Sequence, residues 1–148
     1  MQELKCILLV EDDPHDAELI MTGFAENNLA NEVVSARDGK EAIDYLSYNG
    51  KFAHRTGDNP AVVLLDLKLP KLSGFEVLKR IRSDERLKLT PVIILTSSKE
   101  DKDILEGYRL GANGYVVKPV DFHEFIDVVK QIRGFWMIVN EPPPPVEC

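Results

Sequence analysis

The chain has 148 residues, 44% of them hydrophobic, and its 25 acidic residues against 18 basic ones give a net charge of −7. This length and hydrophobic content suit one domain with a single core. The negative charge argues against binding nucleic acid or an anionic membrane by counterion release. The two cysteines, Cys6 and Cys148, indicate no disulfide framework. We therefore expect a reduced, cytoplasmic protein without a signal peptide or membrane span.

Short apolar segments alternate along the chain with segments of helical period. Five segments are rich in β-branched residues and have strand length: 6–10, 32–36, 61–65, 92–96 and 114–118. Between them, four helix starts are marked by capping residues: Asp13 before Pro14, Asp38 with Glu41, Ser73 with Glu76, and Asp121 with Glu124. This order predicts an α/β fold of the (βα)5 type, a doubly wound parallel five-stranded sheet.

Two segments interrupt the alternation. Residues 48–60 resemble a loop, and residues 134–148 join an apolar cluster to four prolines that must be extended. We therefore divide the chain into a domain at 1–133 and a C-terminal extension at 134–148. The apolar cluster is hard to bury in a domain that already has its layers, so it predicts a surface for a homodimer or for docking another protein, which includes Phe135, Trp136 and Ile138. The alternative is that it folds back over the domain's own core.

The expected strands deliver chemically active side chains at their carboxyl ends, where function gathers in an open parallel sheet. These residues are Glu11, Asp12 and Asp13 after the first strand, Asp66 after the third, Thr96 at the end of the fourth, and Lys118 after the fifth. Clustered carboxylates repel one another unless a cation lies among them, and such oxygen ligands suit Mg²⁺. Each residue alone has a plainer explanation. An acid could cap a helix or complement the helix dipole, and a lysine could simply be solvated. Together they form a set that can bind a phosphoryl group on a carboxylate.

Four sequence motifs resemble those of the receiver domain of two-component response regulators, the CheY-like family. They are "LLVEDDP", "LLDLKLPKLSGFEVLKRIR", "PVIILTSS" and "GANGYVVKPVD", and the match is collinear over residues 5–133. The resemblance implies strand order 2-1-3-4-5. The longer 48–60 loop and the "GFW" tail also resemble a subset of stand-alone receivers encoded beside bacterial phytochrome histidine kinases.

The resemblance implies a role for each matching residue. Asp66 would be the phosphoacceptor, with Glu11, Asp12, Asp66 and the backbone carbonyl of Lys68 around Mg²⁺; Thr96 would be the switch hydroxyl, Tyr115 the switch aromatic and Lys118 the phosphate-binding lysine. Asp13 falls one position past the acidic pair and is read as a helix cap. A sensor histidine kinase would supply the phosphoryl group, and the apolar cluster would then be either a homodimer surface or the docking surface for that kinase. A face formed by the fourth helix, fifth strand and fifth helix would then signal to a downstream protein.

Three rival interpretations differ in class. A phosphatase of the haloacid dehalogenase type would want an Asp two residues after the nucleophile, where this chain has Lys68. A flavodoxin-like redox protein would want hydroxyls around a phosphate where this chain has carboxylates. A pseudo-receiver, folded alike but used only for binding, stays open. Because the chain ends soon after the receiver match, we expect it to act as a stand-alone module. We expect no enzymatic activity beyond its own phosphorylation and dephosphorylation.

Overall fold

The computed structural model describes residues 6–25 and 32–144. Its centre is a five-stranded parallel sheet with the order β2-β1-β3-β4-β5, which confirms the predicted order. The strands are β1 (Cys6–Val10), β2 (Glu32–Ala36), β3 (Val62–Leu65), β4 (Val92–Thr96) and β5 (Gly114–Val117). All residues of β3 and β4 are buried, as expected for strands covered on both faces. The carboxyl ends of all five strands therefore meet at one edge of the sheet.

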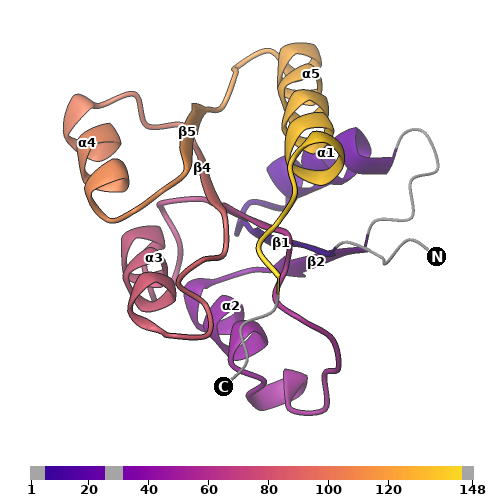
Figure 1. Ribbon diagram of the computed structural model, residues 1–148. Helices are drawn as coiled ribbons and strands as arrows, with labels where there is room; N and C mark the ends of the chain where they lie inside the picture. Colours follow the sequence, from indigo (N-terminus) through magenta and orange to yellow (C-terminus); the bar gives the residue numbers. More distant parts are fainter. Residues whose placement is uncertain (1–5, 26–31, 145–148) are drawn as a thin grey trace.

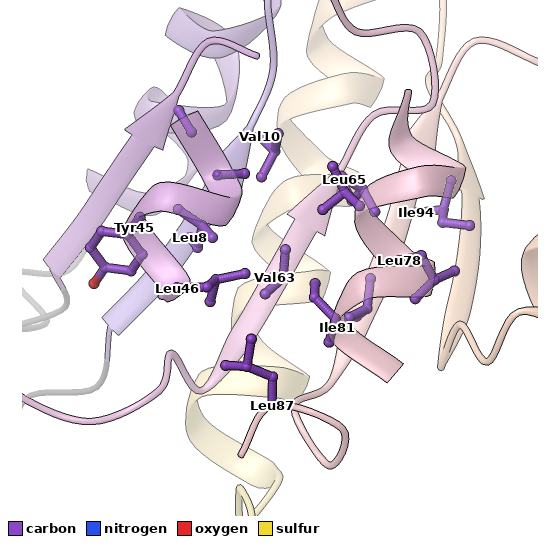
Figure 2. Packing of buried hydrophobic residues seen from close by; sticks show 14 of the residues in the cluster. Leu8, Val10, Tyr45, Leu46, Val63, Leu65, Leu78, Ile81, Leu87 and Ile94 are labelled. Carbon is purple, nitrogen blue, oxygen red and sulfur yellow. The ribbon is translucent and has the colours of Figure 1, made fainter. Parts of the chain in front are cut away.

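Helices cover both faces of the sheet (Figure 1). They are α1 (Pro14–Ala25), α2 (Gly39–Leu46), α3 (Gly74–Ser83), α4 (Asp101–Arg109) and α5 (Phe122–Arg133). Alternate strand residues point to opposite faces, so Ile7 and Leu9 pack with α1 and α5, whereas Leu8 and Val10 pack with α2 and α3. Figure 2 shows the second of these two layers, with Leu78 and Ile81 of α3 facing β3. Among the described residues, no helix is long and apolar enough to cross a membrane.

The predicted helix caps are present. The side chains of Asp13, Asp38, Ser73 and Asp121 each accept a hydrogen bond from a backbone N–H in the first turn of the helix that follows. The carboxylate of Asp13 accepts a hydrogen bond from the backbone N–H of His15 at 2.8 Å. Asp13 therefore caps α1, as predicted for the third acid of the motif "LLVEDDP". Each bond satisfies a donor that the helix itself cannot pair.

The segment 48–60 is more ordered than a plain loop. It contains a short 3₁₀ helix, Gly50–Phe52, and the Phe52 ring packs edge-on against Tyr45 of α2. The guanidinium of Arg55 lies 4.1 Å from the ring centres of both Tyr45 and Tyr48. Because this segment leads into the start of β3, it lies at the end of the sheet opposite Glu11, Asp12 and Asp66.

The C-terminal apolar segment continues α5 as one turn of wider, π-type helix, Gly134–Val139 (η3). Met137 is buried in the layer formed by α1 and α5, and Trp136 packs partly against it. Phe135, Ile138 and Val139 are 49%, 56% and 68% exposed. The segment thus divides its side chains between the domain's own core and its surface. Residues 145–148 of the predicted extension, Cys148 among them, lie outside the described part of the chain, as do residues 1–5 of the predicted domain.

Candidate functional site

The side chains predicted at the strand ends converge on the ammonium group of Lys118. Its Nζ lies 2.5 Å from Glu11 Oε1 and 2.9 Å from Asp66 Oδ2. Glu11 follows β1, Asp66 follows β3 and Lys118 follows β5, so three strands supply one ion cluster. All three residues are almost fully buried, with side chains no more than 9% exposed. Charge-assisted hydrogen bonds of this kind hold the groups in a fixed geometry.

A third carboxylate, which sequence reasoning missed, also binds this ammonium group. Asp16 Oδ2 lies 2.9 Å from Lys118 Nζ, across 102 positions of the chain. Asp16 stands in the first turn of α1, where an acid is expected anyway to complement the helix dipole. Its position in that turn was the available signal, but only the docking of α1 on the sheet reveals which way it points.

The two buried carboxylates beside Lys118 have opposite pKa shifts. Burial raises the pKa of Glu11 to about 8, and the hydrogen bond from Lys118 only partly offsets this. Burial also acts to raise the pKa of Asp66, but the hydrogen bond and charge of Lys118 outweigh it, so the pKa of Asp66 falls below its usual value. The same contacts raise the pKa of Lys118 despite its burial. Asp66 is therefore ionised at neutral pH and Lys118 carries its charge.

Three of the predicted metal ligands lie together. One carboxylate oxygen from each of Glu11, Asp12 and Asp66 can be chosen so that all three lie within 4.8 Å of one another. Glu11 and Asp66 are buried, whereas Asp12 is exposed, so the cluster is open to solvent on one side. A set of carboxylate oxygens with an open side fits a hard divalent cation that retains water ligands. At Lys68, the backbone N–H lies 3.4 Å from Asp66 Oδ1 and donates to it.

The backbone around Asp66 is held by close packing of α3. A Cβ atom added to Gly74 would lie 2.2 Å from the carbonyl oxygen of Asp66. Only glycine therefore lets the start of α3 approach this strand end so closely. The capping residue Ser73 and Gly74, both within the motif "KLSG", thus fix where α3 begins and where Asp66 lies.

The two predicted switch residues lie on the same face of the sheet. Tyr115 pairs with Ile94 across β4 and β5, and Thr96 follows Ile94 by two residues. Thr96 is fully buried, and within the described part of the chain its hydroxyl has no hydrogen-bond partner of normal geometry. It still lies close enough to Asp66 to favour the ionised carboxylate. Tyr115 is partly buried and its hydroxyl donates to the carbonyl of Ser98 at 3.0 Å.

Comparison with known proteins decides the family. The sequence model of one protein family, the response regulator receiver domain, matches residues 7–130 of this chain. This chain belongs to the response regulator receiver family. The receiver is 40% identical to the probable methanogenesis regulatory protein FilR2 of Methanothrix harundinacea (strain 6Ac), over 94% of this chain and 88% of FilR2. It is 35% identical to the response regulator Rcp1 of Synechocystis sp., over 90% of this chain and 89% of Rcp1.

Solved structures similar to the receiver include several phytochrome response regulators. The phosphorylated cyanobacterial phytochrome response regulator RcpA matches with a TM-score of 0.91 and 39% identity, over 96% of this chain and all of RcpA. The bacteriophytochrome response regulator RtBRR matches with a TM-score of 0.76 and 51% identity, over 96% of this chain and 86% of RtBRR. The Mn²⁺-bound form of Rcp1 matches with a TM-score of 0.88 and 34% identity, over 95% of this chain and 99% of that one. The receiver is thus closely similar to the phytochrome response regulators RcpA and RtBRR, and to a response regulator crystallised with Mn²⁺.

Proposed function

We propose that this receiver accepts a phosphoryl group from a sensor histidine kinase onto Asp66 in a Mg²⁺-dependent reaction. The observation that carries the proposal is the state of Asp66. Its carboxylate is ionised, lies at the end of a buried strand, and is held by Lys118 beside the acidic pair. An ionised, positioned carboxylate is a competent nucleophile for phosphoryl transfer.

The proposed reaction exchanges one bond for another. An oxygen of Asp66 forms a bond to phosphorus, and the bond between phosphorus and the donor imidazole nitrogen breaks, its electron pair leaving with the imidazole. Lys118, already beside Asp66 Oδ2, neutralises charge on the transferred oxygens. Glu11, Asp12 and Asp66, with the carbonyl of Lys68, would hold Mg²⁺, which supplies further charge neutralisation when bound. The chain acts on its own aspartate and not as an enzyme on other molecules.

The proposed output runs from Thr96 to the α4-β5-α5 face. Among the described residues, the buried Thr96 hydroxyl has no hydrogen-bond partner of normal geometry, which is costly, and an aspartyl phosphate would offer it an acceptor oxygen. Movement of Thr96 and Tyr115 would then alter the face that carries Leu105, Tyr108 and Phe122, each more than half exposed. Apolar side chains on that face suit a protein partner rather than nucleic acid, which the net charge of −7 also disfavours.

The proposed phosphoryl donor is a kinase of the phytochrome type, in the cytoplasm. The similarity to RcpA and RtBRR, which are named as phytochrome and bacteriophytochrome response regulators, supports this choice. FilR2, named for methanogenesis, is similar over as much of the chain, so the choice needs a direct comparison of kinases. We also propose a homodimer that uses Phe135, Trp136 and Ile138 of η3. Two of these, Phe135 and Ile138, are about half exposed, which leaves them available to a second copy.

The deciding experiment measures phosphorylation of the intact protein by acetyl phosphate with Mg²⁺, read by mass spectrometry. The wild type should gain one phosphoryl group and Asp66→Asn should gain none. Asp58→Asn, an exposed acid near the opposite end of the sheet, is the matched control and should behave as the wild type. Equal labelling of Asp66→Asn would overturn the proposed site, and no labelling of the wild type by acetyl phosphate or any kinase would favour a pseudo-receiver. Ranking transfer rates from phosphorylated kinases then tests the phytochrome assignment.

A further inference from the structure

A chain of hydrogen bonds joins the start of α4 to β5 through the connection at residues 97–100. The hydroxyl of Ser98 donates to Asp103 Oδ2 at 2.6 Å, and the hydroxyl of Tyr115 donates to the carbonyl of Ser98 at 3.0 Å. Ser98 lies two residues after Thr96. Asp103, in the first turn of α4, thus contacts the segment that leaves the candidate site without touching the site itself.

The bond to Asp103 fixes where the Ser98 carbonyl points. A hydroxyl donating to a carboxylate makes a stronger bond than one between neutral groups. The same Ser98 oxygen accepts from the backbone N–H of Glu100 at 3.4 Å, so one side chain is tied at both its donor and its acceptor. With Ser98 held in this way, its carbonyl stays aimed at the Tyr115 hydroxyl.

The side of the Tyr115 ring is fixed by a second contact with α4. A Cβ atom added to Gly107 would lie 2.7 Å from Ile94 Cδ1 and 3.3 Å from Tyr115 Cδ2. Glycine at this position therefore lets α4 lie directly on the ring and on the strand residue paired with it. Tyr115 is held at its hydroxyl by the 97–100 connection and along its ring by the middle of α4.

We propose that Asp103 is a positioning residue that couples the Asp66 site to the α4-β5 surface by holding Ser98 where Tyr115 can bind it. The arrangement of Tyr115 then has two states, one with its hydroxyl on Ser98 and one released to solvent, and Asp103 shifts the population toward the first. The link to phosphorylation rests on the function proposed for Asp66. The link between Asp103 and Tyr115 does not.

The test compares Asp103→Ala with Asp101→Ala. Both substitutions remove one negative charge from the first turn of α4, so the effect on the helix dipole is matched. Asp101 is exposed and its side chain makes no hydrogen bond within the described ranges. The first readout is the ¹⁹F NMR signal of 3-fluorotyrosine at position 115, assigned with Tyr115→Phe, in protein without a phosphoryl donor. The second is the initial rate of phosphorylation by acetyl phosphate.

Asp103→Ala should move the Tyr115 signal toward that of a solvent-exposed ring and slow phosphorylation by about fivefold, the effect of one lost hydrogen bond on a two-state population. Asp101→Ala should match the wild type. Asp103→Asn should retain both properties, because its amide oxygen still accepts the Ser98 hydroxyl. Ser98→Ala, which keeps the backbone carbonyl, should reproduce Asp103→Ala, and the double variant should add nothing further.

Each outcome bears on the inference, including a failure to fold. If Asp103→Ala unfolds, Ser98→Ala decides by the same two readouts. An unchanged Tyr115 signal in Ser98→Ala, or equal effects of Asp101→Ala and Asp103→Ala, would overturn the role of Asp103. If the wild type takes no phosphoryl group, the proposed function fails, while the Tyr115 signals of the same variants still decide whether Asp103 holds the tyrosine.

Discussion

At the scale of single residues, the site separates two neighbouring carboxylates into different roles. Glu11 and Asp66 both contact Lys118 and both are buried, yet the pKa of Glu11 is raised to about 8 while that of Asp66 is lowered. One ammonium group cannot fully offset the burial of two negative charges. Asp66 keeps the charge that a nucleophile needs, and Glu11 becomes the group whose ionisation a bound cation would favour.

The raised pKa of Glu11 makes stability depend on pH when no divalent cation is present. Below about pH 4.5 the group is protonated in both the folded and unfolded states. Between pH 4.5 and 8 the unfolded chain releases this proton while the folded one keeps it, so the free energy of unfolding falls as pH rises. The loss should be on the order of a few kcal/mol, measured by urea unfolding at pH 5 to 8 without metal. Glu11→Gln, which cannot titrate, should show a flatter profile.

The comparison of the two profiles isolates Glu11. Groups remote from Glu11 contribute equally to the wild type and the variant. The lowered pKa of Asp66 affects stability only in the acid range, and the raised pKa of Lys118 only in the alkaline range. Parallel profiles for the wild type and Glu11→Gln would show that Glu11 ionises normally.

Mg²⁺ binding should depend on Asp12 and not on its neighbour Asp13. Asp12 offers an oxygen to the cluster with Glu11 and Asp66, whereas Asp13 accepts backbone N–H groups of α1. Asp12→Ala should abolish Mg²⁺ binding in a calorimetric titration. Asp13→Ala should still bind Mg²⁺ but lose about 1 kcal/mol of stability from the missing cap. The reverse order of effects would mean that the two acids have exchanged roles.

At the scale of elements, the sequence predicts what is local and misses what depends on docking. The caps at Asp38, Ser73 and Asp121 were predictable because cap and helix are adjacent in the chain. The contacts of Arg82 were not predictable, because its guanidinium donates hydrogen bonds to the carbonyls of Thr90 and Gly111, which lie outside α3. The contact of Asp16 with Lys118 was not predictable for the same reason, since the two residues are far apart in the chain. A pattern of residue types shows where a helix starts, but not which distant groups its side chains reach.

The contact between α3 and β3 gives an element-scale prediction. Gly74→Ala should push the start of α3 away from the Asp66 carbonyl, since no room exists for a Cβ atom there. We expect slower phosphorylation by acetyl phosphate and a loss of stability of about 1–3 kcal/mol, as for overpacking. Gly134→Ala is the control, because its Cβ would meet nothing within 4 Å in a helical backbone. It should leave phosphorylation unchanged and stability equal or slightly higher. Equal effects of the two substitutions would contradict this account of Gly74.

At the scale of the whole molecule, the alternation of strands and helices was enough to predict the sheet. Strands that alternate with helices form a parallel sheet covered on both faces, and the rules of right-handed, short connections leave few ways to arrange it. The fate of the apolar tail was harder to predict. Residues 135–139 are all apolar, so their sequence has no polar face to mark which side meets the core. The structure resolves this by turning Met137 inward and leaving Ile138 and Val139 outside. The prediction of a homodimer can therefore be tested with residues that do not also serve the core.

If the exposed side of η3 forms a symmetric interface, Ile138→Ser should weaken association without lowering stability. Phe135, Ile138 and Val139 are the exposed large apolar side chains of η3, so they are available to a symmetric contact with a second copy. Met137→Ala is the matched control for the buried side. It should cost about 2–5 kcal/mol of stability, as truncation of a core methionine does. Trp136→Ala, from a half-buried position, should reduce both properties while leaving phosphorylation of Asp66 by acetyl phosphate intact.

Sedimentation velocity of the wild type and these variants, with and without beryllofluoride as a phosphoryl mimic, measures the association. Because η3 continues α5, whose face should respond to phosphorylation, we expect beryllofluoride to shift the wild type toward dimer, and dimerisation to favour beryllofluoride binding by the same factor. Ile138→Ser should abolish the shift at equal protein concentration while retaining the unfolding midpoint. A wild type that stays monomeric under both conditions would mean that the tail only packs on the domain's own core. An Ile138→Ser variant that dimerises as well as the wild type would contradict an interface on the exposed side of η3.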